Sequence, residues 1–239
     1  MDSRKKIAVA GASGYVGQSI ANELEKRGDC LVIRVTRQNH DAMRDQAYDV
    51  LINSAMPAKR FWARNNPLED YRETVEKTLG FFQGWKFKKF IHISSVSARC
   101  ETDTVYGKHK AEAEKICNDG KSLIVRLSAM FSPDLSTGVL IDILKGTQLF
   151  VSGESRYCFC AKDFVAQWIA HHMELTGIVE VGAKNTLSLQ EIADHLKKKI
   201  NFEGRTELQE IISPRPDFPD AREVLAFMEQ MAERYPKKE

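Results

Sequence analysis

Residues 7–20 read Ile-Ala-Val-Ala-Gly-Ala-Ser-Gly-Tyr-Val-Gly-Gln-Ser-Ile, and this stretch decides the fold of the chain. It begins as a short apolar run, which is typical of a buried strand. It continues with Gly11, Gly14 and Gly17 at the spacing G-x-x-G-x-x-G. After the last glycine, apolar residues recur on one face of a helix. The stretch therefore predicts a strand, a glycine-rich turn and a helix in close succession.

Each of the three glycines has a physical role in such a segment. Gly11 permits a tight turn after the strand, and Gly14 lets backbone N–H groups approach a pyrophosphate. Gly17 lets the helix pack closely on the sheet. The helix N-terminus adds partial positive charge where phosphates would lie. Because the glycines stand between a predicted strand and a predicted helix, the segment predicts a dinucleotide-binding site.

Strands and helices alternate along the chain after this segment. The next predicted strands span 31–35, 49–55, 89–94 and 123–127. The polar segment 39–47 is too short for the usual strand and helix, so an abbreviated crossover is expected there. A long helix starts at Pro67, and its apolar residues at helical spacing are expected in the core: Leu68, Tyr71, Val75, Leu79 and Phe82. The alternation predicts an α/β fold with a doubly wound parallel sheet, whose ligands lie beyond the carboxyl ends of the strands.

Composition limits the other possibilities. A chain of 239 residues is long enough for one α/β domain with a small lobe. The 35 basic and 33 acidic residues give a net charge of +2, which offers no argument for a nucleic-acid or membrane partner. With no apolar run of membrane length and no signal peptide, a cytoplasmic location is expected. The five cysteines form no C-x-x-C pair, so they are interpreted as reduced thiols, and no metal site is predicted.

The end of the second predicted strand bears on the choice of cofactor. This strand ends at Thr36 and Arg37 and not at an acidic residue. An acid at this place accepts both ribose hydroxyls and repels a 2′-phosphate, whereas a basic residue accommodates one. The sequence therefore favours NADP over NAD, with Arg37 as the phosphate partner and Arg34 as an open alternative.

A candidate catalytic group follows the strand at 89–94. Ser95 stands at the carboxyl end of that strand, on the same edge as the glycine turn. Tyr106 and Lys110 are four residues apart, which places both on one face of a helix. The ammonium is expected to lower the pKa of the Tyr106 phenol toward neutrality, so that it can exchange a proton with a carbonyl or alcohol oxygen held by Ser95. His109 is interpreted as a surface residue of the same helix.

This order of motifs resembles the short-chain dehydrogenase/reductase superfamily. Within it, the chain resembles the extended NAD(P)-dependent branch of nucleotide-sugar epimerases, dehydratases and reductases. The resemblance also rests on the strand Asp-Val-Leu-Ile-Asn-Ser-Ala at 49–55 and covers nearly the whole chain. It implies one Rossmann-like NAD(P)-binding domain over residues 1–239, with substrate-lobe elements mainly from 129–160 and 178–239. It also implies a homodimer formed through helices 67–84 and 106–118.

The resemblance assigns roles by position. The implied catalytic residues are Ser95, Tyr106 and Lys110. The implied cofactor contacts are Gly11, Ser13, Gly14, Tyr15, Val16, Gly17, Arg37, Ala55, Tyr106 and Lys110. The implied substrate contacts are Ser95, Arg156 and Arg215, with the two arginines on the substrate pyrophosphate. Thr74 and Ala129 stand where the branch often has asparagine, and these departures put the identity of the substrate in doubt.

The two residues that follow Ser95 reduce the number of reactions to consider. Val96 and Ser97 stand where a dehydratase of this branch has acid/base carboxylates, so dehydration is disfavoured. Keto reduction remains, as does 4-epimerisation by oxidation and re-reduction on a tightly held cofactor. The basic residue at 37 favours an NADPH-dependent reductase of a nucleotide-linked 4-keto-6-deoxy sugar. The alternatives are a nucleotide-sugar 4-epimerase, a reductase of a small non-nucleotide carbonyl, and a non-catalytic NADP-binding redox sensor.

Overall fold

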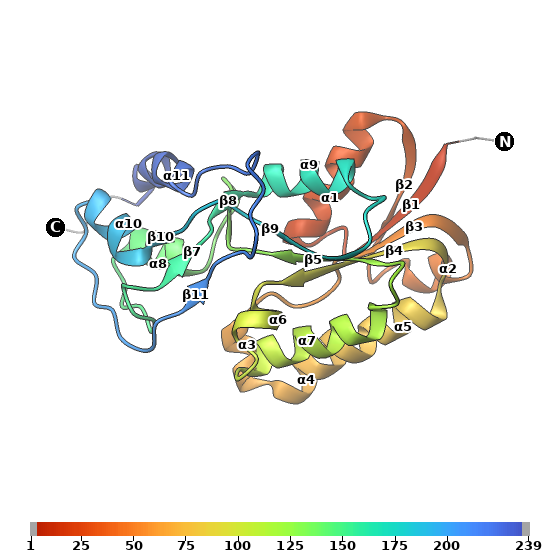
Figure 1. Cartoon of the computed structure of the whole chain (residues 1–239), viewed down its shortest axis with the longest axis horizontal. Helices are drawn as coiled ribbons and strands as arrows, with labels where there is room; N and C mark the ends of the chain where they lie inside the picture. Colours follow the sequence, from red (N-terminus) through yellow and green to blue (C-terminus); the bar gives the residue numbers. More distant parts are fainter. Residues whose placement is uncertain (1–3, 236–239) are drawn as a thin grey trace. The chain divides into compact units, whose positions relative to one another are not determined.

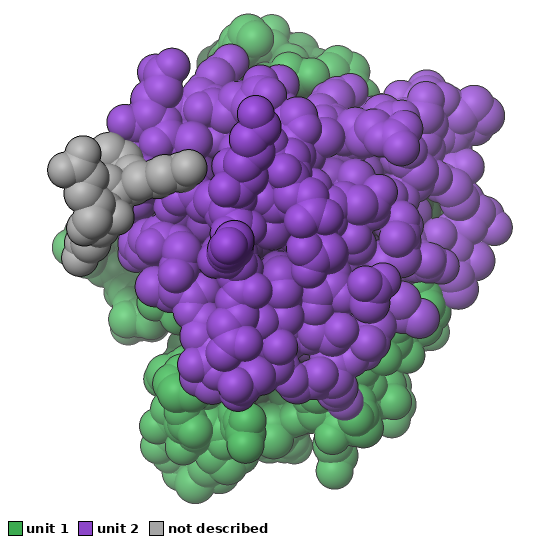
Figure 2. Space-filling view, turned by 90° about the vertical axis from the view of Figure 1, so that its left-hand side faces the viewer, with its two compact units in different colours: residues 1–127, 163–179 green, residues 128–162, 180–239 purple. Residues whose placement is uncertain are grey.

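The computed structural model describes residues 4–235 and divides into two compact units. The first unit comprises the chain up to residue 127 together with 163–179, and the second comprises 128–162 together with the chain from 180 onward. Figure 1 labels the helices and strands, and Figure 2 colours the first unit green and the second purple.

The first unit is built on a six-stranded sheet in the order β2-β1-β3-β4-β5-β9. Strands β1 to β5 pair in parallel, as the sequence predicts. The elements that build this unit are β1 (Lys5–Ala10), α1 (Tyr15–Arg27), β2 (Cys30–Val35), α2 (His40–Arg44), β3 (Ala47–Asn53), α3 (Arg60–Asn65), α4 (Pro67–Tyr71), the π-helical turn η1 (Arg72–Glu76), α5 (Lys77–Gly84), β4 (Lys86–Ser95), α6 (Ser97–Cys100), α7 (Val105–Cys117), β5 (Leu123–Leu127), α9 (Lys162–His171) and β9 (Gly177–Val181).

Helices cover both faces of this sheet. Figure 1 shows α1 and α9 on one face and α4, α5 and α7 on the other. The predicted doubly wound Rossmann-like sheet is therefore confirmed. Only the short helix α2 stands between β2 and β3, which confirms the abbreviated crossover.

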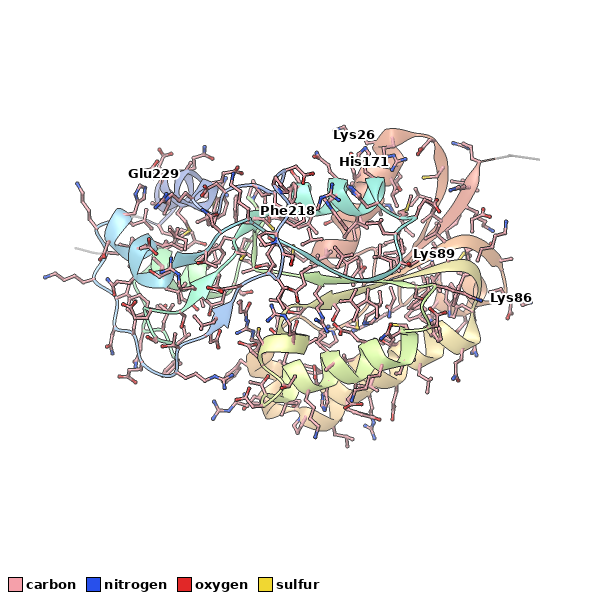
Figure 3. The ribbon with its side chains drawn as sticks, in the orientation of Figure 1. Lys26, Lys86, Lys89, His171, Phe218 and Glu229 are labelled. Carbon is pink, nitrogen blue, oxygen red and sulfur yellow. The ribbon has the colours of Figure 1, made fainter. Side chains whose placement is uncertain are left out.

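The carboxyl ends of the strands meet at one edge of the sheet. Ala10 of β1 is aligned with Val35 of β2 and with Asn53 of β3, and Ser95 of β4 is aligned with Leu127 of β5. The glycine turn, the end of β2 and Ser95 therefore follow strands that end at this edge. The opposite edge carries lysines, of which Figure 3 labels Lys86 and Lys89 on β4.

The helical segment after Pro67 buries a different face from the one predicted. Leu68, Tyr71 and Leu79 are exposed, whereas Val75 is buried and Phe82 is half-buried. The prediction that all five lie in the core is therefore wrong. Helical periodicity locates an apolar stripe along a helix, but it does not say on which side the rest of the protein lies.

The inward face of the same segment is mostly polar. Asp70, Thr74 and Thr78 are buried there. The Thr78 hydroxyl donates to the Thr74 carbonyl over 2.7 Å and accepts from the Asn53 amide over 3.3 Å. The π-helical turn η1 interrupts the helix at the level of Thr74. Such turns are frequent at functional sites.

The second unit contains two small sheets. One has the strand order β10-β7-β11, and the other pairs β6 with β8. Ser188 caps α10 with a reciprocal capping box to Glu191. The elements of this unit are β6 (Met130–Phe131), α8 (Val139–Lys145), β7 (Arg156–Tyr157), β8 (Cys160–Ala161), β10 (Leu187–Ser188), α10 (Leu189–His195), β11 (Leu208–Gln209) and α11 (Glu223–Ala232).

The structure can be compared with what composition suggests about the cysteines, a membrane-spanning helix and a metal site. The five cysteines are all free thiols, and Cys158 and Cys160 are buried. Within residues 4–235, no helix combines the length and the apolar character that crossing a bilayer requires. The same residues contain no cluster of three side chains suited to holding a metal ion.

Candidate active site

The turn between β1 and α1 has the geometry that its glycines predict. Gly11 adopts a φ of +78°, and a Cβ added there would lie 2.7 Å from the Ala55 Cα and the Ser54 carbonyl oxygen. A Cβ on Gly17 would lie 2.3 Å from the Gly11 carbonyl oxygen. Neither position tolerates a side chain without a shift of backbone. The turn thus brings the predicted contact residues Gly11 and Ala55 together.

The N-terminus of α1 is open to an anion. Gly14 is the N-cap residue, no side chain caps the helix there, and the first turn holds no acidic residue. Of the other predicted contacts in this turn, Ser13 is exposed, and Tyr15 and Val16 are half-buried. Backbone N–H groups at such a helix end bind phosphate. The residues present therefore fit the pyrophosphate of a nicotinamide dinucleotide.

The two arginines near the end of β2 differ in what they contact. The Arg34 guanidinium forms two hydrogen bonds of 2.7 Å to the Glu25 carboxylate and one of 2.6 Å to Asn22. Arg37 lies exposed in the turn after β2 and forms no hydrogen bond or ion pair with any residue in 4–235. The backbone N–H groups of the glycine turn donate to Val35, two residues before Arg37. Arg37 is therefore available to an anion beside this turn, and Arg34 is occupied.

Ser95, Tyr106 and Lys110 come together at the end of β4 and the start of α7. Ser95 is half-buried, and its hydroxyl lies close enough to the phenol of Tyr106 to lower the pKa of that phenol. Thr104 caps α7 by accepting from the N–H of Gly107 over 3.0 Å, which fixes the first turn that carries Tyr106. The Lys110 ammonium lies 5.3 Å from the centre of the Tyr106 ring. Both side chains are buried.

The electrostatics of Tyr106 differ from the prediction. Burial raises the pKa of its phenol above the ordinary value, while the Arg60 guanidinium and the hydrogen bond with Ser95 act in the opposite direction. Burial also lowers the pKa of Lys110 to about 8. The prediction that Lys110 brings the pKa of Tyr106 toward neutrality is therefore wrong for this state of the chain. The low-dielectric surroundings disfavour both charged forms.

Arg60 is a residue that the sequence did not single out. It begins α3, and its guanidinium lies 3.2 Å from the carboxylate of Glu101, which is buried in the turn before α7. It is the cation that lowers the pKa of Tyr106. No motif spacing links residue 60 to residue 106, so only the packing of α3 on α7 brings them together.

His109 is not the surface residue that the sequence suggests. Its Nδ1 lies 2.8 Å from a carboxylate oxygen of Asp70, and its side chain is only 13% exposed. Asp70 comes from α4 and is fully buried. The interpretation of His109 as an exposed helix residue is wrong because α4 covers this side of α7.

A family model matches residues 7–160, more than half of the chain, and this span includes the glycine turn, Ser95, Tyr106 and Lys110. The chain belongs to the NAD-dependent epimerase/dehydratase family. It is therefore an NAD(P)-dependent enzyme of the short-chain dehydrogenase type. No curated protein matches the sequence.

Solved structures share the fold of this family member over nearly its whole length. An NAD-dependent NDP-hexosamine 5,6-dehydratase of tunicamycin biosynthesis gives a TM-score of 0.76 at 13% identity, covering 98% of this chain and 99% of that chain. A dTDP-4-dehydrorhamnose reductase from Clostridium acetobutylicum gives 0.76 at 14% identity, covering 95% and 99%. A UDP-glucose 4-epimerase from Thermotoga maritima gives 0.71 at 14% identity, covering 97% and 100%. These likenesses show a common fold.

The predicted substrate arginines of this family member lie in the second unit. Arg156 stands on β7, where its Nε donates to the Thr186 hydroxyl over 2.9 Å and its Nη2 lies 3.4 Å from the Glu191 carboxylate. Arg215 pairs with Asp217 over 3.0 Å and is exposed. Both guanidinium groups are held by neighbours in their own unit.

Proposed function

We propose that the chain is an NADPH-dependent reductase that converts the keto group of a nucleotide-linked 4-keto-6-deoxy sugar to an alcohol. The observation that carries the choice of cofactor is Arg37, an exposed cation without a partner among residues 4–235, beside the glycine turn. A 2′-phosphate is the group that such a cation accommodates. The use of a nicotinamide cofactor as such follows from membership of the family.

Three side chains would perform the proton chemistry. Bound NADPH would supply a hydride to the keto carbon. Ser95 would hold the keto oxygen by a hydrogen bond, and the Tyr106 phenol would donate its proton to that oxygen. The product gains one C–H bond from the hydride and one O–H bond from Tyr106. The Lys110 ammonium would stabilise the tyrosinate that remains until the phenol regains a proton, and by resemblance it would also bind the nicotinamide ribose.

The substrate class has separate support. Two of the structures with this fold are dTDP-4-dehydrorhamnose reductases, and one of these is a complex with NADP. We assign the second unit to substrate binding, with Arg156 and Arg215 as contacts of the substrate pyrophosphate. Guanidinium groups suit this role because their planar N–H donors match phosphate oxygens.

The test is an assay of the purified chain with NADPH or NADH and two kinds of substrate. With dTDP-4-keto-6-deoxyglucose, the proposal expects stoichiometric oxidation of NADPH and loss of this activity in Tyr106→Phe. Interconversion of UDP-glucose and UDP-galactose without net NADPH oxidation would instead identify an epimerase. Binding of NADPH without turnover of any nucleotide sugar or small carbonyl would indicate a redox sensor and overturn the proposal.

A further inference from the structure

Asp70 is a buried carboxylate whose hydrogen bonding is incomplete. It is fully buried, and within residues 4–235 the one hydrogen bond of its side chain joins Oδ2 to the Nδ1 of His109 over 2.8 Å. Its other oxygen, Oδ1, has no hydrogen-bond partner among these residues. Removing a carboxylate from water is costly unless a positive charge or several donors compensate it. The position of Asp70 therefore calls for a cation nearby.

His109 supplies a positive charge to Asp70 only when its imidazole is protonated, and the other cation on this part of α7 is Lys110. It follows His109 on α7 and is only 4% exposed, and its ammonium forms no hydrogen bond with any residue in 4–235. Asp70 meets α7 at His109, the residue directly before Lys110, so the carboxylate reaches the part of the helix that carries the ammonium. In agreement with this placement, the negative charge of Asp70 raises the pKa of Lys110 against the effect of burial. A buried ammonium needs a counter-ion as much as a buried carboxylate does.

The other titratable groups around Lys110 are either already paired or neutral. Glu114, one turn further along α7, accepts from the Ser94 hydroxyl over 2.6 Å and from two nitrogens of Arg126 over 2.7–2.9 Å. On β4, burial lowers the pKa of His92 to about 3, so this histidine is neutral at ordinary pH. Asp70 therefore remains as the neighbouring carboxylate with one oxygen, Oδ1, that has no hydrogen-bond partner among residues 4–235.

Three further groups lie near Tyr106 and His109, the neighbours of Lys110 on α7. The guanidinium of Arg60 on α3 lies beside the carboxylate of Glu101, which stands in the turn before α7. The ring of Tyr71 on α4 contacts the imidazole of His109 edge-on, with the ring centres 5.4 Å apart. His109 therefore contacts two residues of α4, Asp70 through its Nδ1 and Tyr71 through its ring.

We propose that Asp70 is the buried counter-ion of Lys110 and that His109 holds the Asp70 carboxylate in position. Both act on the reaction through Lys110, so they are positioning residues. Asp70 would keep Lys110 charged at neutral pH, although burial alone works against the ammonium. The effect on catalysis rests on the proposed function, whereas the charge pairing does not.

The direct test follows the charge of Lys110 in the chain without ligand. Lysine labelled with ¹³C at Cε reports deprotonation as a change of chemical shift, and the Lys110→Met variant assigns the signal. In the unmodified chain the midpoint is expected near the value of about 8. Asp70→Asn should lower this midpoint by about one pH unit or more, because an opposite charge is removed.

Glu69→Gln is the matched control for this titration. It removes the same charge from the neighbouring residue of α4, but Glu69 is exposed and pairs with Arg72. The Lys110 midpoint should not move in this variant. An unchanged midpoint in Asp70→Asn, or an equal shift in Glu69→Gln, would overturn the proposal. Neither result depends on the substrate, so the pairing can fail while the proposed function stands.

A double-mutant cycle covers the case in which Asp70→Asn does not fold. Asp70→Asn leaves the ammonium uncompensated, and Lys110→Met leaves the carboxylate uncompensated, so each should lower the urea midpoint. The double variant should unfold cooperatively, and its urea midpoint should fall by less than the sum of the two single decreases. Additive losses, or a double variant that also fails to fold, would overturn the proposal.

The consequence for the reaction is a shift of its pH profile. For an active enzyme, the alkaline decline of kcat/KM should move to lower pH in Asp70→Asn and remain in place in Glu69→Gln. His109→Gln keeps a donor for Asp70 and should shift the profile less than His109→Ala. A uniform loss of rate with no shift of the profile would indicate a merely structural role and contradict the proposal.

Discussion

At the scale of single residues, Arg37 decides the preference between the two nicotinamide cofactors. Arg37→Gln should weaken NADPH binding by roughly tenfold to a hundredfold, because a hydrogen bond to a charged group contributes about 1.5–3 kcal/mol. Binding of NADH should not change, since NADH has no 2′-phosphate. Titration calorimetry with each cofactor measures both affinities.

Arg34→Gln is the control for Arg37, because Arg34 is already paired with Glu25. Its NADPH affinity should equal that of the unmodified chain. A selective loss of NADPH affinity in Arg34→Gln, and not in Arg37→Gln, would transfer the phosphate role to Arg34.

The charge on Lys110 predicts a pH dependence of keto reduction. Its pKa is lowered to about 8, so the ammonium dominates below this pH and the neutral amine above it. The raised pKa of Tyr106 keeps the phenol protonated in the same range. We therefore expect kcat/KM to fall as the pH rises through about 8. Rates measured between pH 6 and 10 check this.

Lys110→Arg separates the charge of residue 110 from other causes of that decline. A guanidinium stays charged over this range, so the variant should be slower but lack the decline near pH 8. A decline that persists unchanged in Lys110→Arg would show that another group titrates.

The sequence predicts residues that belong to a motif better than residues that meet only in space. Ser95, Tyr106 and Lys110 stand at fixed places relative to one strand and one helix, and the structure brings them together. Arg60 and Asp70 come from helices whose packing on α7 no spacing encodes. For this reason the sequence could not have placed them beside Tyr106 and Lys110.

At the scale of elements, the turn between β1 and α1 depends on the absence of side chains. Gly17→Ala places a Cβ 2.3 Å from a backbone oxygen, so it should destabilise the chain by about 1–3 kcal/mol and weaken cofactor binding. Gly80→Ala in α5 meets nothing within 4 Å and should stabilise by about 0.5–1 kcal/mol. Urea unfolding measures both, and equal effects of the two variants would contradict this account.

Some element boundaries are encoded locally, where one residue type controls them. Gly28 ends α1 with a φ of +73°, and Ser188 with Glu191 starts α10. The face of the helix after Pro67 was predicted wrongly. Its inward side includes the polar residues Asp70, Thr74 and Thr78 beside apolar ones, and Asp70 contacts His109 of α7. An apolar stripe carries no information about such a neighbour.

At the scale of the whole molecule, the exposed apolar residues of α3 and α4 support the expectation of a homodimer. Phe61 is 78% exposed and Leu68 is 59% exposed. Apolar groups at a surface often mark an interface. Light scattering should find a dimer that Leu68→Glu converts to a monomer. The control is Leu208→Glu, at a residue of similar exposure in the second unit. A monomeric unmodified chain would contradict the expectation.

The substrate lobe expected at 129–160 and 178–239 stays a prediction as regards its role. The second compact unit spans 128–162 and the chain from 180 onward. The chain returns to the first unit between these segments to form α9. Composition does not reveal such a return, whereas resemblance to a family does.

Transfer of deuterium is the measurement that tests the proposed reaction most directly. NADPH that carries deuterium at the transferred position of its nicotinamide C4 would be incubated with the chain and dTDP-4-keto-6-deoxyglucose. The account predicts one deuterium at C4 of the sugar for each NADPH oxidised, and none with Tyr106→Phe. A sugar product without deuterium, or the same incorporation in Tyr106→Phe, would contradict it.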